Sequence, residues 1–179
     1  MTATRGRRPG RRLCGGLAAL TLCLGGCAMA PGYPLAPGLL EIAIERPLTV
    51  PPGRAHIKLQ HGRQVRAVNR YEPWCELETS SVSAGAQRLD PARLPVARFS
   101  HAFIKDYDTR MPALLGGLSC DDLVFQETVW WFDPAAPSPA IYLRCLAPYT
   151  HCVFGPPLSP DQAQAVVGNA LAIRRGAEG

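Results

Sequence analysis

Residues 55–62 read Ala-His-Ile-Lys-Leu-Gln-His-Gly, and this stretch decides the fold class that we expect. Apolar Ile57 and Leu59 alternate with polar neighbours, which is the pattern of a β-strand with one buried face. His61-Gly62 can form a tight turn, and the alternation resumes over residues 63–67. The segment therefore predicts a β-hairpin.

Further strands are expected on both sides of this hairpin. The candidates have apolar or alternating sequences and are bounded by turns rich in proline and glycine. They are residues 39–44, 74–79, 94–104, 123–132 and 141–146. Residues 39–44 could instead be a docking segment, and residues 94–104 are either a pair of strands or one bent strand.

The last part of the chain changes from a strand pattern to a helix pattern. Ser159 offers an N-cap, Pro160 suits the first helical position, and Gln162 can close a capping box. Arg174 and Arg175 would suit the negative end of the helix. Apolar residues at helical spacing define one stripe, made of Ala163, Val166, Val167, Ala170 and Leu171. We therefore expect an α+β fold, in which a small, mainly antiparallel β-sheet carries one C-terminal amphipathic helix, in a single globular domain over residues 39–179.

The N-terminus carries the pattern of an export signal. Five arginines lie within residues 1–12, no acidic residue precedes Glu41, and residues 13–24 form an apolar stretch too short to span a bilayer. This combination is typical of a secretory signal peptide, predicted over residues 1–26. The apolar stretch ends in Leu24-Gly25-Gly26-Cys27, which resembles the lipobox of bacterial lipoprotein precursors. The alternative is an ordinary signal peptide cut near residues 28–30, with an incidental cysteine.

The lipobox resemblance implies how the protein is held in the cell. In this family the cysteine, here Cys27, receives a lipid, and the signal peptide is cleaved before it. A residue other than Asp after that cysteine, here Ala28, implies an outer-membrane location with the body facing the periplasm. Residues 27–38 are rich in proline and are predicted to form an extended tether of roughly 30 Å. The only partner implied at this point is the membrane, through the lipid anchor.

The charge distribution excludes one class of function. The chain has 19 Lys and Arg against 14 Asp and Glu, a formal net charge of +5. Five of those basic residues lie in the predicted signal peptide, which leaves 14 basic and 14 acidic residues from Cys27 onward. The basic excess therefore belongs to the export signal, and we expect no nucleic-acid partner.

The cysteines fit an oxidising compartment. Of the seven, two lie in the predicted signal peptide and Cys27 lies in the lipobox-like motif. The remaining four cysteines are expected to form two disulfides in the periplasm. We expect the pairs Cys75–Cys145 and Cys120–Cys152, with a local Cys145–Cys152 pair as the rival.

A metal site is the alternative use of these cysteines. Cys120, Cys145, His151 and Cys152 are possible ligands, and residues 121–122 are both aspartates. Structural zinc sites usually show ligand pairs two to four residues apart, whereas the close pair here, at 151–152, is adjacent. We therefore expect neither a metal nor another cofactor.

Catalytic groupings are sparse in the sequence. Ser100 and His101 are neighbours on an expected strand, where adjacent side chains face opposite sides. Glu76 and Glu78 could be paired carboxylates, but alternating acids on a solvent-facing strand surface are the commoner arrangement. His56 lies near the hairpin turn and is expected at the surface. The sequence therefore names no catalytic residue.

Tryptophans near the strands are the remaining candidates for a functional surface. Trp130 and Trp131 must point to opposite faces of a strand, so one of them could be exposed. Together with Trp74 they form a possible binding surface. The alternative is that the sheet core, the helix or a loop covers them.

The body of the chain resembles small lipoproteins of Gram-negative envelopes. The resemblance lies in residues 50–54, Val-Pro-Pro-Gly-Arg, in residues 71–78, Tyr-x-Pro-x-Cys-x-Leu-Glu, and in the closing helix. It implies a place in the envelope and no activity. We expect a lipid-anchored, non-enzymatic binding or assembly module with an envelope protein as partner. The alternatives are a periplasmic hydrolase or accessory enzyme acting on envelope material, and a metal-binding lipoprotein.

Overall fold

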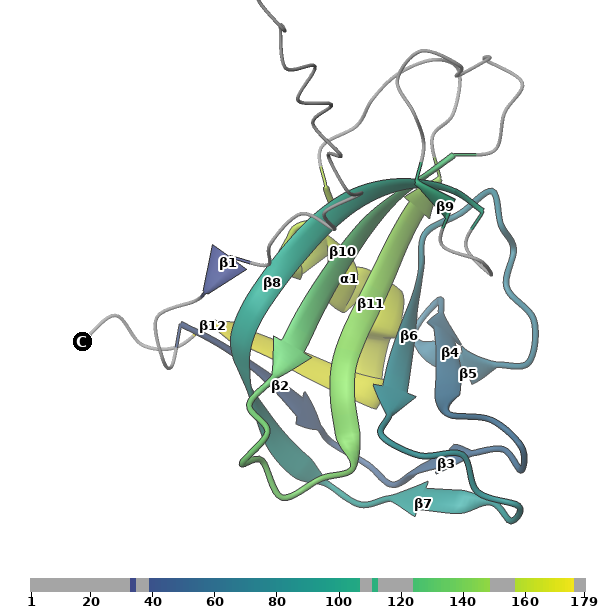
Figure 1. Cartoon of the computed structure of the whole chain (residues 1–179), viewed down its shortest axis with the longest axis vertical. Helices are drawn as coiled ribbons and strands as arrows, with labels where there is room; N and C mark the ends of the chain where they lie inside the picture. Colours follow the sequence, from purple (N-terminus) through teal and green to yellow (C-terminus); the bar gives the residue numbers. More distant parts are fainter. Residues whose placement is uncertain (1–32, 35–38, 107–110, 113–123, 149–156, 176–179) are drawn as a thin grey trace, which may run out of the picture.

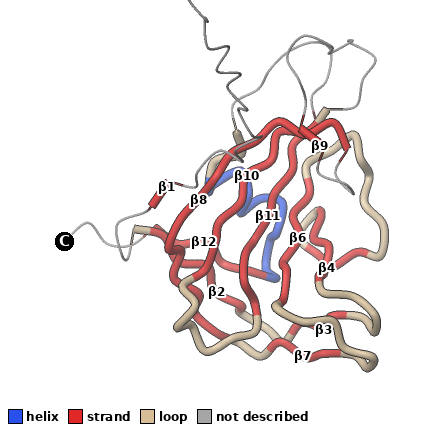
Figure 2. Tube along the Cα trace, viewed as in Figure 1, coloured by secondary structure: helices blue, strands red, loops and turns tan. Residues whose placement is uncertain are grey.

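The structure is a computed structural model of the chain. It describes residues 33–34, 39–106, 111–112, 124–148 and 157–175. An antiparallel sheet dominates these residues, and one short helix near the C-terminus packs against it (Figures 1 and 2). The expectation of a mainly antiparallel sheet with a C-terminal helix is confirmed at that level.

The main sheet follows the strand order β12-β2-β8-β10-β11-β6-β4-β5, with every pairing antiparallel. Its strands are β2 (Leu40–Ile44), β4 (His56–Gln60), β5 (Arg63–Val65), β6 (Trp74–Thr79), β8 (Ala92–Asp106), β10 (Phe125–Phe132), β11 (Ala140–Pro148) and β12 (Leu171–Arg175). The short strands β1 (Tyr33–Pro34) and β9 (Met111–Pro112) pair with β8. A separate two-stranded sheet is formed by β3 (Leu48–Val50) and β7 (Gln87–Leu89).

The sheet curls around the helix. Helix α1 (Pro160–Val167) contacts β12 at one end of the strand order and β6 and β4 near the other end (Figure 1). Strand β8 links the β12–β2 part of the sheet to the part that begins with β10, because its first residues pair with β2 and its later residues pair with β10. Ala97 is an extra residue opposite Trp131 and Phe132, and such a bulge bends and twists a strand. Residues 94–104 are therefore part of one bent strand.

Buried side chains lie on both faces of the sheet. The concave face and the helix share the main core, which includes Leu59, Leu77, Leu143, Ala163 and Val167. A second buried cluster on the convex face consists of Trp74, Ile104, Phe125 and Leu146. The helix thus covers one face, while the central strands also bury part of the other.

The predicted hairpin is present as β4 and β5. His61 and Gly62 at its turn have φ angles of 53° and 74°. Two successive positive φ angles are the requirement of a type I′ turn, whose twist matches that of the flanking strands. Strand β6 covers the expected residues 74–79, and residues 40–44 form a strand and not a docking segment.

The helix begins as predicted. The Ser159 hydroxyl accepts a hydrogen bond from the Gln162 backbone N–H at 3.2 Å. In return, the Gln162 side-chain oxygen accepts one from the Ser159 backbone N–H at 2.9 Å, and Pro160 occupies the first helical position. This capping box fixes the start of α1.

The expected end of the helix is wrong. The helix stops at Val167, residues 168–170 form a 3₁₀ turn, and residues 171–175 leave as β12. Gly168 causes this change, because its φ angle is 54° and a Cβ there would lie 2.3 Å from the Cα of Gly62. Arg174 and Arg175 are therefore strand residues beside β2, and they do not cap a helix.

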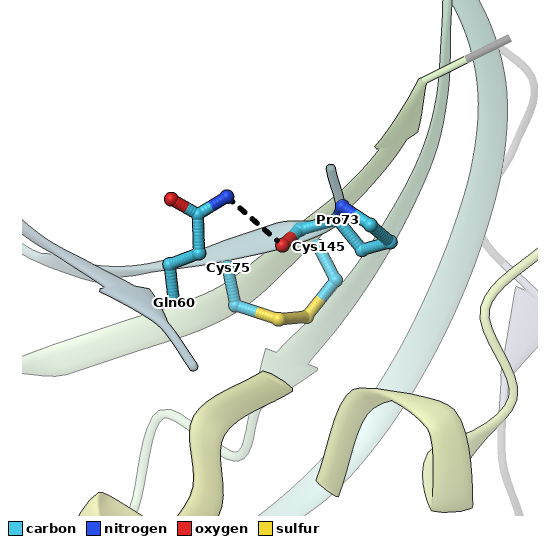
Figure 3. Close-up of a disulfide and its surroundings, with 4 residues drawn as sticks. All are labelled: Gln60, Pro73, Cys75 and Cys145. Carbon is cyan, nitrogen blue, oxygen red and sulfur yellow. Dashed lines mark hydrogen bonds between the residues drawn. A yellow bond between two sulfur atoms is a disulfide. The ribbon is translucent and has the colours of Figure 1, made fainter. Parts of the chain in front are cut away.

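A disulfide joins β6 to β11. Cys75 and Cys145 are direct cross-strand partners, and both are fully buried in the main core (Figure 3). The predicted pair is therefore present, and the rival Cys145–Cys152 pair is wrong. Cys120 and Cys152 lie outside the described residues, so their pairing stays a prediction.

A buried amide supports the loop that leads to this disulfide. The side chain of Gln60 is 3% exposed and donates a hydrogen bond to the carbonyl of Asn69 at 3.0 Å. It also donates one to the carbonyl of Pro73 at 3.3 Å (Figure 3). Its oxygen accepts from the Asn69 N–H at 2.9 Å. The loop between β5 and β6 is thus held against the end of β4.

Part of the predicted tether contacts the domain. Tyr33 and Pro34 form β1, whose cross-strand partners on β8 are Phe99 and Arg98. At this point the tether is a short strand beside the sheet and not a free spacer. Cys27 lies outside the described residues, so its role as the lipid acceptor stays a prediction.

Candidate functional site

An apolar cavity opens between the sheet and the start of the helix. Its volume is about 430 Å³, which lies within the range of small-molecule sites in proteins. Five separate segments supply its walls. They contribute Leu39 and Leu40 before and in β2, Phe99 and His101 of β8, Trp130 of β10, Pro157, Leu158, Ser159 and Pro160 at the start of α1, and Arg175 of β12.

The inner wall of the cavity is buried apolar surface. Leu40, Trp130 and Leu158 are each less than 9% exposed, and Phe99 is the cross-strand partner of Trp130. Leu39 is 46% exposed and marks a point where the cavity meets solvent. An apolar molecule entering there would gain about 25 cal/mol for each Å² of its surface removed from water.

The polar groups of the cavity already have partners. The Nδ1 atom of His101 lies 3.1 Å from the Thr128 hydroxyl, and burial lowers the pKa of His101, so its ring is neutral at pH 7. Arg175 pairs with Asp161 at 3.0 Å, and the Ser159 hydroxyl serves the helix cap. The cavity therefore offers apolar contact and a neutral imidazole, with no uncompensated charge among its described lining residues.

His101 is not arranged for nucleophilic catalysis. Ser100 faces the opposite side of β8, as expected from the strand alternation. The hydroxyl beside His101 belongs to Thr128, which is 1% exposed and does not line the cavity. The other hydroxyl in the cavity wall, that of Ser159, serves the helix cap, and no hydrogen bond joins these two described side chains, Ser159 and His101, as a nucleophile–base pair would require.

The convex face carries a buried charge cluster that sequence analysis missed. Glu76 and Glu127 are 1% and 2% exposed, and Arg144 lies between them. Arg144 donates a hydrogen bond to Glu76 and lies 3.5 Å from Glu127, while Lys58 lies 3.7 Å from Glu76. Burial disfavours the charged guanidinium, but the two carboxylates outweigh this effect and raise the pKa of Arg144. The cluster is thus a compensated structural network.

The expectation that Glu76 faces solvent is therefore wrong. Its carboxylate lies within the sheet's buried surface, because Arg144 on the neighbouring strand β11 neutralises it. Glu78 is partly exposed and lies 3.7 Å from His56. His56 is only 26% exposed, and burial is the main cause that lowers its pKa. Neither acid has the free carboxylate pair that glycosidase chemistry requires.

The tryptophans do not form an exposed surface. Trp74 and Trp130 are 0% and 4% exposed, so burial excludes them as surface contacts. Trp131 is partly buried, with the Arg98 guanidinium 4.2 Å from its ring centroid and the Tyr142 ring at 4.6 Å. Trp130 gains a different role, as a wall of the cavity.

Metal binding finds no support in the described part of the chain. No group of three or more His, Cys, Asp or Glu side chains is gathered there in a way that could hold an ion. Cys145 is committed to the disulfide. The other candidate ligands, Cys120, His151, Cys152 and the aspartates 121–122, lie outside the described residues.

Comparison with protein-family models, curated proteins and solved structures finds no match to this chain. Within the described ranges, no helix is long and apolar enough to cross a membrane. A function for this domain is therefore inferred from its geometry. The cavity had no local signal in the sequence, because its walls come from segments as far apart as residues 39 and 175.

Proposed function

We propose that the chain is a lipid-anchored protein of the outer membrane that faces the periplasm and binds an apolar ligand without catalysing a reaction. The cavity beside α1 is the observation that carries the binding part of this proposal. Its lining is mainly apolar, its polar groups are already partnered, and its volume of about 430 Å³ suits a single small ligand. These properties favour an uncharged molecule over an ion.

The proposed lipid anchor explains where such a ligand would come from. Cys27 lies six residues before Tyr33, and six extended residues span at most about 20 Å. Tyr33 pairs with Phe99, which lines the cavity. A lipid on Cys27 would therefore hold the cavity close to the bilayer surface, where apolar molecules concentrate. We propose that the ligand is an apolar molecule exchanged with that membrane.

A hydrolase is the less favoured function. His101 is the titratable group that faces the cavity wall from β8, and its hydroxyl neighbour Thr128 is buried away from the cavity. The Nδ1 atom of this neutral imidazole is occupied by Thr128, and its Nε2 atom fits a role as the hydrogen-bond partner of a ligand that carries one polar atom.

The anchor is tested by the intact mass of the protein purified from membranes. The proposal expects a chain that begins at Cys27 and carries acyl groups, and a Cys27→Ala variant that leaves the membrane fraction. A mass without lipid would refute the anchor and leave the cavity argument standing.

Ligand binding is tested with N-phenyl-1-naphthylamine, an uncharged apolar fluorophore. The soluble form is residues 28–179 exported behind a cleavable signal peptide, so that no detergent competes. We expect saturable binding, weakened at least about tenfold by Leu39→Glu, because a carboxylate would then stand in an apolar wall. Val82→Glu is the matched control, since Val82 is 64% exposed and does not line the cavity. Equal loss in both variants, or no binding by the parent protein, would refute the cavity as the site.

A further inference from the structure

A second cleft lies on another part of the domain and has the opposite character. Its volume is about 720 Å³, and none of the described residues that line it also lines the apolar cavity. It lies between the β4–β5 hairpin and the segments around β3 and β7, at the side of the sheet shown at the lower right of Figure 1. Its walls are formed by Thr49, Pro51, Pro52, Arg54, His56, Ile57, Lys58, Gln64, Val65, Arg66 and Ala86.

The lining of this cleft is basic. Among the described residues that line it are Arg54, Lys58, Arg66 and His56, and none of them is acidic. Lys58 is compensated by Glu76 at 3.7 Å. Arg54 and Arg66 are exposed, and neither guanidinium forms an ion pair with any other described residue. The cleft therefore presents two uncompensated cations.

The surroundings sharpen this contrast. Several other arginines of the domain are paired with carboxylates, including Arg88 with Asp90 at 2.7 Å and Arg174 with Glu45 at 2.6 Å. Basic and acidic residues are equal in number from residue 27 onward, so the cleft is not a sample of a generally basic surface. The cleft thus brings Arg54 and Arg66 together in one hollow, with no acidic side chain among its described lining residues.

We propose that this basic cleft binds a phosphate-bearing polar ligand. The planar guanidinium groups of Arg54 and Arg66 match the oxygens of a phosphate, which each can bind through two parallel hydrogen bonds. The cleft is larger than a phosphate alone, and Thr49 and Gln64 in its wall suit a polar group of sugar size attached to it. A phosphorylated soluble compound and a lipid headgroup share this chemistry.

His56 provides an internal reporter of binding. Burial is the main cause that lowers its pKa, and the positive charges of Lys58, Arg144 and Arg54 lower it further, while Glu76 acts in the opposite direction. Glu78 also faces the ring, at 3.7 Å. A phosphate beside Arg54 would offset the positive field, so binding is expected to raise the pKa of His56.

The test uses the lipidated protein in micelles of an uncharged detergent. Titration with inorganic phosphate and with glucose 1-phosphate is followed by calorimetry and by the NMR signal of the His56 ring. We expect saturable binding tighter than about 1 mM and a raised pKa of His56 in the bound state. Arg54→Gln and Arg66→Gln should each weaken binding about tenfold, since each removes a charge-assisted contact.

Arg63→Gln is the matched control, because Arg63 is an exposed cation on the same hairpin that does not line the cleft. This variant should bind within about twofold of the wild type. Micelles doped with phosphatidic acid form the third arm. If phosphatidic acid micelles raise the pKa of His56 and diacylglycerol micelles do not, the ligand is a lipid headgroup. If only the soluble phosphates raise it, the ligand is a free phosphorylated compound. No saturable binding in any arm, or equal losses in Arg54→Gln and Arg63→Gln, would overturn the proposal.

Discussion

The disulfide between β6 and β11 yields the sharpest stability prediction. Cys75 and Cys145 are 70 residues apart in sequence, so the bond closes a long loop in the unfolded chain. The chain-entropy relation gives about 4 kcal/mol of stabilisation for a loop of this length. Most domains have a total stability of about 5–15 kcal/mol, so loss of the bond should leave a marginally stable protein.

The perturbation is the double substitution Cys75→Ala and Cys145→Ala, measured by urea unfolding without reductant. Both sulfurs lie in the main core, so a small packing loss adds to the loss of the cross-link. We expect the free energy of unfolding to fall by about 4 kcal/mol. The strand pairing around the two positions remains, so far-UV circular dichroism below the transition should be unchanged.

Reductant separates this disulfide from the second predicted one. If Cys120 and Cys152 are paired, reductant should destabilise the double variant further, by about 3–4 kcal/mol for the shorter loop. If they are not paired, the double variant should not respond. A loss below about 1 kcal/mol for the double substitution itself would contradict the argument, because the structure gives the bond a long loop to close.

Three further predictions concern the described residues. Arg144→Met should cost about 3–5 kcal/mol in urea unfolding, because it removes the guanidinium that lies between two buried carboxylates, and a cost below about 1 kcal/mol would contradict the cluster. His56 and His101 have pKa values lowered from 6.5 in the folded state, so the unfolded chain takes up protons first as the pH falls. Stability should therefore be full above about pH 6.5 and decline below it, and a flat profile of unfolding free energy from pH 7 to pH 5 would refute this. Gly168→Ala should destabilise by more than about 1 kcal/mol, because φ is 54° and the new Cβ would strike the β4–β5 turn, whereas Gly85→Ala, with nothing within 4 Å, should be nearly neutral.

The sequence predicted the elements that are determined by a few consecutive residues. The hairpin followed from alternation and from a turn that tolerates positive φ at His61 and Gly62. The start of α1 followed from the Ser159–Gln162 capping box, which involves four consecutive residues. The Cys75–Cys145 bond was inferred from expected strands, since both cysteines occur within them.

The misplaced features depend on contacts between distant segments. Gly168 ends the helix where its backbone meets Gly62, more than 100 residues earlier in the chain, and no pattern around it encodes that approach. Glu76 is buried because Arg144 and Lys58, on two other strands, compensate its charge. An alternating strand that is buried on both faces looks, in sequence, like one that faces solvent.

The two candidate sites could not be predicted from the sequence for the same reason. The apolar cavity combines side chains from β2, β8, β10, α1 and β12, and the basic cleft combines β3, β4 and β5. Single apolar residues such as Leu158 and single arginines such as Arg66 are ordinary in any domain. The curl of the sheet around the helix brings the first set together, and the packing of β3 beside β4 brings the second set together (Figure 1).

The most direct test of the proposed function is contact between an apolar ligand and the cavity wall. Methyl-labelled protein, residues 28–179, is mixed with decanol, and intermolecular nuclear Overhauser effects are recorded. The proposal predicts contacts from the decanol chain to the methyl groups of Leu40 and Leu158, and none to Leu77, which is buried elsewhere in the core. An absence of contacts, or contacts confined to exposed methyl groups such as those of Val82, would contradict it.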